Sequence, residues 1–297
     1  MDARPLIQAL PRDFTLTLVD VGSAGGLNER WQPFSPILSS ILFDPREREA
    51  SGSFGRGEKR VYPVALGHAP GEARLYLTQM ANMSSFLRPD PAVFERYGKK
   101  SRDAAVASEE LVPIERLDGL ADRDGFRADV LKVDTQGSEM MVLKGAGQTL
   151  KSVLLAEIEV SFFQRYQDQP LFAEIEAHMA AHGFELIDLL KLKRYRSSNS
   201  LAVRNAAVRV TDRSGQLAYA DAIFLRREED ILSAASTDGG ASILRAAVAL
   251  VAYGKADMAA RLLDLGRDLL PDGQAEAVGK ALTVLRRGLL HRLLGRA

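Results

Sequence analysis

The feature that most constrains this chain is an apolar segment that ends in an acidic residue and a glycine-rich loop. Residues 16–26 read LTLVDVGSAGG, so Asp20 closes the run and Gly22, Gly25 and Gly26 follow in the loop. Such a run predicts a buried parallel strand that delivers backbone to a ligand at its carboxyl end. Glycine permits positive φ and a close approach of the ligand.

A second acid follows about one βαβ unit later. Residues 41–45 read ILFDP, in which a short apolar run again ends in an acid, Asp44. Because the carboxyl ends of parallel strands share one edge of a sheet, we expect Asp20 and Asp44 to lie at the crevice where open α/β sheets bind cofactors.

Composition excludes several classes of function. The 297 residues include 39 basic and 39 acidic side chains, so no net charge attracts nucleic acid or an anionic surface. The chain has no cysteine, which excludes disulfides and thiolate chemistry, and its four histidines lack the spacing of a zinc helix motif. We therefore expect no metal site.

No apolar run reaches the roughly 20 residues that span a bilayer, and residues 1–14 lack a signal-peptide core, so we expect a cytoplasmic protein.

Strand-like and helix-like patterns alternate along the first three quarters of the chain. We expect strands at residues 16–21, 41–43, 60–65, 73–77, 130–133, 153–158, 184–188 and 219–225, and helices at 28–39, 91–97, 138–150 and 170–182. The last two strands suit an antiparallel hairpin at the sheet edge. Residues 233–240, SAASTDGG, predict a linker, and residues 241–297 predict an all-helical extension.

The first loop suits the amino-acid part of a ligand. A zwitterionic amino acid needs backbone N–H groups for its carboxylate, which the loop around Gly22 and Ser23 supplies, and an acceptor for its ammonium, which Asp20 supplies directly or through water. The alternative is a tight turn without a ligand. Asp44 suits the two ribose hydroxyls of a nucleoside cofactor. Its alternative is a solvated acid beside the charged residues 46–49.

Two further pairs of acids suit chemistry on an acceptor. The segment LKVDTQGSEMMVLKGA ends a buried strand with Asp134 and places Glu139 in the first turn of a helix, so Asp134 is a candidate base or orienter. The alternative is a capped helix with an acidic first turn. Glu157 and Glu159 share one face of a buried strand, and Glu159 is the better candidate for the mouth of the site. The alternative is a salt bridge to a neighbouring lysine or arginine.

The last segment, residues 279–297, carries leucines at helical spacing interleaved with lysine and arginine. This pattern predicts a helix for a membrane surface, a partner or self-association, or a packing helix with a basic exposed face.

Across residues 16–226 the chain resembles the FkbM-type family of S-adenosylmethionine-dependent methyltransferases. The resemblance rests on the order and spacing of blocks, which are VDVGSAGG, ILFDP, PVALG with MSSFL, VLKVDTQGSEMMVLKGA, LLAEIEVSFFQRY with QPLF, and HGFELIDL. It implies a Rossmann-like α/β fold whose seven-stranded, mostly parallel sheet has an antiparallel last strand, with residues 1–232 as the methyltransferase domain. Ala24, Asp44 and Gln136 depart from the family pattern, which has asparagine, glutamate and glutamate there.

The resemblance also implies roles for individual residues. The methionine part of S-adenosylmethionine would lie at Asp20, Gly22, Gly25 and Gly26, the ribose at Asp44, and the adenine at Ala65 and Leu66. Asp134 would lie near the sulfonium, and the acceptor would face Glu139, Glu159, Ser84 and Ser85.

The reaction implied is methyl transfer to a hydroxyl of a small-molecule or glycan acceptor, for which we expect a sugar of a cell-surface glycan or glycolipid. The basic residues 191–196 would face a phosphorylated carrier, or form a solvated loop. We expect no nucleic-acid partner, and a place at the inner membrane is an alternative location.

One alternative function is that of a nicotinamide-dependent oxidoreductase. Such an enzyme needs the motif G-x-G-x-x-G, and the loop after Asp20 lacks that spacing. A non-catalytic module that uses residues 241–297 is the other alternative.

Overall fold

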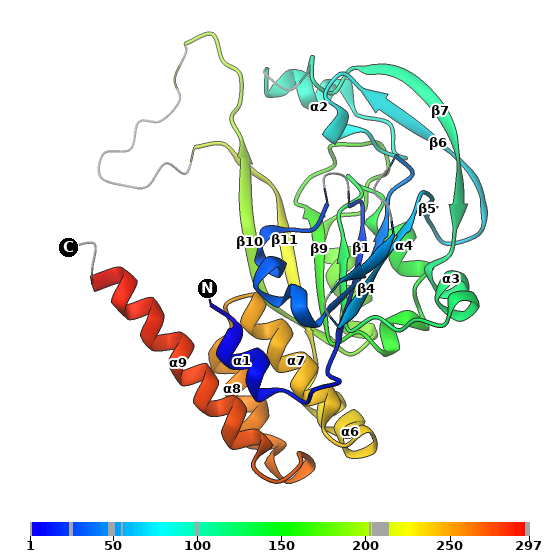
Figure 1. Ribbon diagram of the computed structural model, residues 1–297. Helices are drawn as coiled ribbons and strands as arrows, with labels where there is room; N and C mark the ends of the chain where they lie inside the picture. Colours follow the sequence, from blue (N-terminus) through cyan, green and yellow to red (C-terminus); the bar gives the residue numbers. More distant parts are fainter. Residues whose placement is uncertain are drawn as a thin grey trace.

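The computed structural model describes residues 2–23, 26–46, 51–54, 56–98, 101–201, 203 and 214–294, with the side chains of 53, 54 and 286–294 left out. Within these ranges, the main sheet has eight strands in the order β10-β11-β9-β8-β1-β2-β4-β3 (Figure 1). The strands are β1 (Leu16–Val21), β2 (Leu38–Phe43), β3 (Gly52–Phe54), β4 (Gly57–Tyr62), β8 (Val130–Val133), β9 (Leu155–Ser161), β10 (Phe184–Tyr195) and β11 (Gln216–Arg226).

Seven of these strands form the expected sheet. β4, β2, β1, β8 and β9 are parallel neighbours, while β11 is antiparallel to both β9 and β10. The predicted Rossmann-like fold with an antiparallel last strand is therefore confirmed. The eighth strand, β3, has three residues and pairs antiparallel with β4 at the edge.

A second sheet, which the sequence did not predict as a unit, joins β5 (Ala65–Leu66), β7 (Val106–Glu115) and β6 (Gly71–Thr78). With α2 (Pro91–Arg96) it lies beyond the end of the main sheet where β1 and β8 terminate (Figure 1). The predicted strand over residues 60–65 is split between the two sheets. Pro63 has no N–H to donate, and β4 ends at Tyr62, before it.

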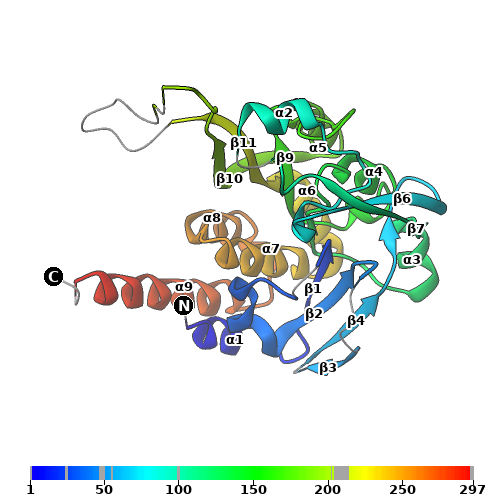
Figure 2. The same ribbon diagram turned by 90° about the horizontal axis from the view of Figure 1, so that it is seen from above.

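Helices cover both faces of the main sheet (Figure 2). One face carries α3 (Leu117–Asp124), α4 (Glu139–Lys144) and α5 (Phe172–Ala181), and the other carries α1 (Arg4–Ala9), α6 (Glu228–Asp238), α7 (Ala241–Ala252), α8 (Ala256–Leu265) and α9 (Gln274–Leu294). Short 3₁₀ helices are η1 (Glu29–Ile37), η2 (Ala81–Met83), η3 (Thr149–Lys151) and η4 (Arg267–Leu269). The sheet thus lies between two apolar layers, which explains why every residue of β9 is buried.

The predicted linker over residues 233–240 is wrong, because α6 runs through it as far as Asp238. Ile231 and Ala235 lie one helical turn apart and are both buried against the sheet, so tertiary packing holds this serine- and alanine-rich segment as a helix. The break comes at Gly239 and Gly240, whose φ angles are 65° and 83°. The predicted helical extension is confirmed.

Two predicted helices are shorter than expected. Residues 28–39 form the 3₁₀ helix η1, in which Pro33 and Pro36 remove backbone donors, and β2 starts at Leu38. Residues 138–150 form α4, which ends at Lys144, and the separate turn η3. A Cβ on the next residue, Gly145, would lie 2.0 Å from a backbone oxygen of Gly67, so the backbones at these two glycines are packed closely together.

The extension is tied to the sheet by a buried polar contact. The Tyr253 hydroxyl, at the end of α7, donates to Glu157 Oε2 on β9 at 2.6 Å, and Arg30 Nη1 lies 3.1 Å from the same oxygen. The Arg30 guanidinium lies 4.3 Å from the centre of the Tyr253 ring. Burial raises the pKa of Tyr253 well above its usual value, so the hydroxyl remains a donor. The C-terminal helices therefore brace the segment that follows the glycine loop.

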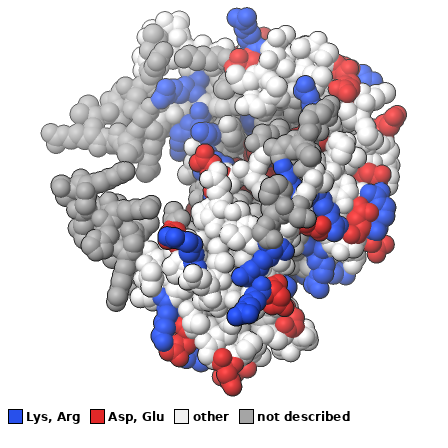
Figure 3. Space-filling model, in the orientation of Figure 1, with Lys and Arg blue, Asp and Glu red and all other residues white. Residues whose placement is uncertain are grey.

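The surface agrees with the balanced composition. Basic and acidic side chains are interspersed on the face shown in Figure 3. In the part of the chain that the structure describes, no helix has the length and apolar character needed to cross a membrane.

We predict that Tyr253→Phe lowers the free energy of unfolding by about 1–2 kcal/mol, because it removes a buried hydrogen bond to a carboxylate and leaves the ring in place. Urea unfolding measures this change. The control is Tyr76→Phe, whose hydroxyl makes no hydrogen bond within the described residues and whose loss should cost less than about 0.5 kcal/mol. Equal stability of the two variants would contradict the proposed brace.

Candidate active site

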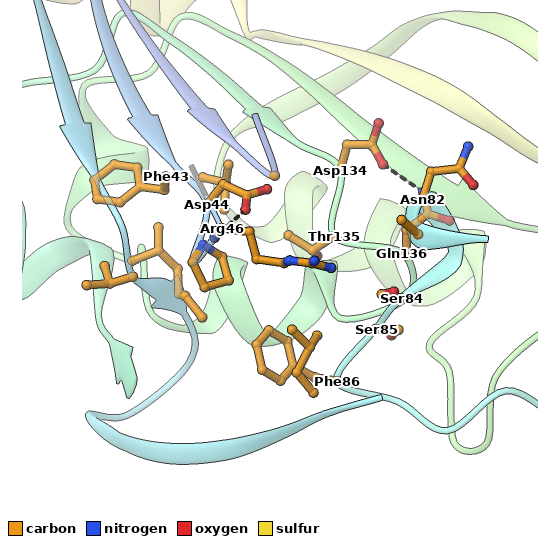
Figure 4. Close-up of a pocket in the computed structure, with 18 residues that line it drawn as sticks. Phe43, Asp44, Arg46, Asn82, Ser84, Ser85, Phe86, Asp134, Thr135 and Gln136 are labelled. Carbon is orange, nitrogen blue, oxygen red and sulfur yellow. Dashed lines mark hydrogen bonds between the residues drawn. The ribbon is translucent and has the colours of Figure 1, made fainter. Parts of the chain in front are cut away.

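A cavity of about 450 Å³ opens where β1, β2 and β8 end, beneath the second sheet (Figure 4). Its walls come from three strand ends of the main sheet, from β5 and β6, and from the segment after η2. The residues around it are Val21, Gly22, Phe43, Asp44, Pro45, Arg46, Val64, Ala65, Leu66, Leu75, Ala81, Asn82, Ser84, Ser85, Phe86, Asp134, Thr135 and Gln136.

A glycine turn at the end of β1 forms the floor of this cavity. The Gly22 N–H donates to the Phe43 carbonyl at 2.8 Å, and its φ is 83°. A Cβ at this position would lie 1.9 Å from the Asp134 carbonyl oxygen, so the turn accepts glycine alone. The backbones of β1, β2 and β8 therefore converge on Gly22.

The residues after Gly22 continue the turn. Gly26 also has a positive φ, 84°, and its N–H donates to the Ser23 carbonyl at 2.8 Å. Ser23 is 2% exposed, and among the described residues its Oγ has no hydrogen-bond partner. Gly25, which the sequence assigns to the same loop, lies outside the described residues, as does Ala24.

Asp44 follows β2 at the cavity wall. Its Oδ1 accepts the backbone N–H of Arg46 at 2.8 Å, which fixes the carboxylate at the start of a turn. The Arg46 guanidinium reaches across the cavity toward Thr135 (Figure 4). Ala65 and Leu66, the predicted adenine contacts, are buried and line the same cavity.

Asp134 lines the cavity at the end of β8, and Gln136 holds its side chain. Gln136 Nε2 donates to Asp134 Oδ1 at 3.0 Å and to Glu159 Oε2 at 2.8 Å (Figure 4 shows the first bond). Ser84 and Ser85, predicted to face the acceptor, lie in the cavity wall near Gln136. The structure thus brings Asp44, Asp134 and the two serines around one volume.

Comparison with known proteins identifies this arrangement. Residues 41–186 match the model of the methyltransferase FkbM domain. The protein carries an FkbM-type methyltransferase domain. The comparisons with curated proteins and with solved structures gave no match. The family match confirms the predicted resemblance over a shorter range than residues 16–226. β1, with the glycine turn that follows it, and β11 lie outside the match, and both strands belong to the main sheet of the methyltransferase.

Asp20 of the methyltransferase lies outside the cavity wall. It is 1% exposed, points to the face of the sheet that carries α7, and pairs with Lys132 Nζ at 2.9 Å. Burial raises the pKa of Asp20, and the Lys132 charge opposes this effect. Asp20 and Lys132 are register partners on β1 and β8, and their ion pair lies near the end of β1, just before the glycine turn.

Glu139 is not among the residues that line the cavity. Its Oε1 accepts the backbone N–H groups of Thr135 and Gly137 at 3.0 and 2.9 Å, and burial raises its pKa. The Glu139 carboxylate therefore stabilises the turn between β8 and α4 through these two hydrogen bonds. The acidic first helical turn that the sequence offered as the alternative is present, and the predicted catalytic role of Glu139 stays a prediction.

Glu159 is also buried behind the cavity wall. Its carboxylate pairs with the guanidinium of Arg165, which is 2% exposed and also donates to Ser161 Oγ at 3.1 Å. Burial raises the pKa of Glu159, and the Arg165 charge opposes the shift. The salt bridge left open as the alternative is thus present, and Glu159 reaches the cavity through Gln136.

Sequence reasoning missed several residues of the site. The sequence places Arg46 in a charged run and gives no local signal for Asn82 or Phe86, yet all three line the cavity. Arg165 lies in the FFQRY block, but nothing local in the sequence indicates that it is buried against Glu159. No cluster of three metal-ligating side chains occurs within the described ranges.

The basic stretch at residues 191–196 belongs mostly to β10 and is largely engaged with neighbours. Lys191 Nζ lies 2.7 Å from Asp221 Oδ2, and Arg194 donates to the Gly215 carbonyl at 3.1 Å. The expected role of this stretch as a surface for a phosphorylated carrier stays a prediction. Side chains of the basic terminal helix beyond residue 285 lie outside the described part, so its predicted partner role stays a prediction.

We predict that Gly22→Ala destabilises the methyltransferase by at least about 2 kcal/mol, because the new methyl group meets the Asp134 carbonyl and the backbone has positive φ. Gly119→Ala is the matched control, since a Cβ there meets nothing within 4 Å. Its helical position in α3 should gain up to about 1 kcal/mol. Thermal and urea unfolding measure both changes, and an unaffected Gly22→Ala protein would contradict the close approach.

We also predict that Asp20→Asn costs about 3 kcal/mol of stability, because it leaves the Lys132 ammonium buried without its counter-charge. Adding Lys132→Gln to Asp20→Asn should restore at least half of the loss. A double variant less stable than Asp20→Asn alone would show that the ion pair is not the cause.

Proposed function

We propose that this methyltransferase uses S-adenosylmethionine to methylate a hydroxyl group of its acceptor. The observation that carries the proposal is the convergence of Gly22, Asp44 and Asp134 on one cavity at the carboxyl ends of three adjacent parallel strands. Open α/β sheets bind nucleoside cofactors at this place.

The residues present fit the cofactor. Asp44 offers a carboxylate to the ribose hydroxyls, and the apolar wall formed with Ala65 and Leu66 suits an adenine ring. The glycine turn lies in the cavity wall at Gly22, where its backbone can approach the amino-acid part closely. The buried Ser23 Oγ, which has no partner among the described residues, offers a further hydrogen bond there.

The chain's own residues divide the work of the reaction. S-adenosylmethionine supplies an electrophilic methyl group on a sulfonium. Asp134 takes up the proton of the acceptor hydroxyl as the oxygen–carbon bond forms and the carbon–sulfur bond breaks. Ser84, Ser85 and Asn82 line the same wall and orient the acceptor, and alignment of the reacting atoms supplies much of the rate.

For the acceptor we propose a sugar hydroxyl of a cell-surface glycan or glycolipid, modified on the cytoplasmic side of the membrane. The support is that small hydroxyl and amide side chains gather in one part of the cavity wall, because such groups hydrogen-bond to sugar hydroxyls. Incubation of the protein with methyl-labelled donor and fractionated cell glycans and glycolipids tests this assignment. Label confined to fractions without sugar would overturn it.

Isothermal titration calorimetry tests the cofactor assignment. The expected result is binding of S-adenosylmethionine and no binding of NAD or NADP. Binding of a nicotinamide cofactor without binding of S-adenosylmethionine would replace the methyltransferase mechanism with an oxidoreductase one.

We predict that Asp44→Ala weakens S-adenosylmethionine binding at least about tenfold, or 1.4 kcal/mol, because the ribose loses its acceptor. The control is Asp122→Ala, which removes an exposed carboxylate on α3 far from the cavity wall and should leave the affinity unchanged. An unchanged affinity in Asp44→Ala would remove Asp44 from the site.

A further inference from the structure

Gln136 occupies a backbone conformation that its residue type rarely adopts. Its φ is 55°, in the left-handed region, and it lies between β8 and α4. Such a position in a residue other than glycine is strained and persists where the surroundings fix it. Here Glu139 fixes it by accepting the N–H groups of Thr135 and Gly137, which flank Gln136.

The side chain explains why this conformation is useful. A carboxamide nitrogen carries two protons, and Gln136 Nε2 directs them to two different carboxylates, Asp134 at 3.0 Å and Glu159 at 2.8 Å. Glu159 is held on its other side by Arg165, so it is a fixed anchor. Gln136 therefore connects Asp134, in the cavity wall, to a buried and rigid ion pair.

The surroundings of Asp134 hold more acids than bases. The titratable groups whose charges interact with Asp134 are Asp20 on β1, Lys132 on β8, Glu139 on α4, Glu159 on β9, and Tyr219 and Asp221 on β11. Asp44 and Arg46 line the same cavity as Asp134, and Arg165 pairs with Glu159. Of the acids in this set, only Asp44 and Asp134 line the cavity. The cavity wall thus carries two carboxylates and the guanidinium of Arg46, and this net negative charge favours a donor with a positive sulfur over one with a neutral sulfur.

We propose that Gln136 is a positioning residue that presents Asp134 to the sulfonium as a fixed carboxylate, by giving one amide proton to Asp134 and the other to Glu159. This inference rests on the proposed function. It assigns to Gln136 the selectivity of the site for the cationic donor over the neutral product, S-adenosylhomocysteine.

The test compares two substitutions that keep the length of the side chain. Gln136→Met cannot donate, so Asp134 loses its anchor. Gln136→Glu adds a third carboxylate and removes both donated protons, so the cluster takes up a proton at a higher pH than in the unaltered protein. Gln167→Glu makes the same charge change at an exposed position and is the control.

The readout is the ratio of the affinities for S-adenosylmethionine and S-adenosylhomocysteine, measured by calorimetry between pH 5.5 and 8.5. We expect Gln136→Met to lower this ratio about tenfold across the range. In Gln136→Glu we expect the ratio to fall as the pH falls, with a midpoint at higher pH than in the unaltered protein. Gln167→Glu should match the unaltered protein.

The outcomes separate this inference from the proposed function. No binding of S-adenosylmethionine to the unaltered protein overturns both. Binding by the unaltered protein, together with an equal loss of both ligands in Gln136→Met, overturns the inference alone, because a purely structural role predicts that result. Thermal unfolding of each variant without ligand shows whether it is folded. If Gln136→Glu is unfolded, Gln136→Met decides the question.

Discussion

The site depends on one close approach, in which the turn at Gly22 rests against the backbone of Asp134. Parallel pairing of β1 with β2 and β8 brings three strand ends to one edge, and the missing side chain at Gly22 lets them converge. As a result, Asp44 and Asp134 line the same cavity, and this placement needs no contact between the two side chains. Glycine at position 22 is therefore required by the packing of the strand ends.

Buried charge surrounds this turn on the inner side. Asp20 with Lys132, Glu157 with Arg30, and Glu159 with Arg165 are ion pairs between elements that are distant in the sequence or separated by a loop. Pairs of this kind contribute little net stability compared with apolar packing, but removing one partner is costly, so they fix the relative positions of the elements they join. Through Arg30 and Tyr253, the C-terminal helices take part in the same arrangement.

Much of the fold could be predicted because its signals are local. The apolar runs that form β1 and β2, each closed by an acid, predict both the strands and the crevice beside Asp44. Partners that depend on register could not be predicted: Lys132 meets Asp20 only because β1 and β8 are neighbours. The second sheet is not predicted as a unit because most of β7 is exposed and Glu109 and Glu110 interrupt its apolar residues. α6 was mistaken for a linker because its serine-rich composition conceals the buried Ile231 and Ala235.

The central claim is that the cavity between Asp44 and Asp134 holds a sulfonium nucleoside. A crystal structure of the protein grown with excess S-adenosylmethionine tests it most directly. The account predicts density for the ribose at the Asp44 carboxylate and for the sulfonium beside Asp134, with the amino-acid part at the glycine turn. Density for the donor at another place on the molecule, with this cavity closed by side chains, would contradict it.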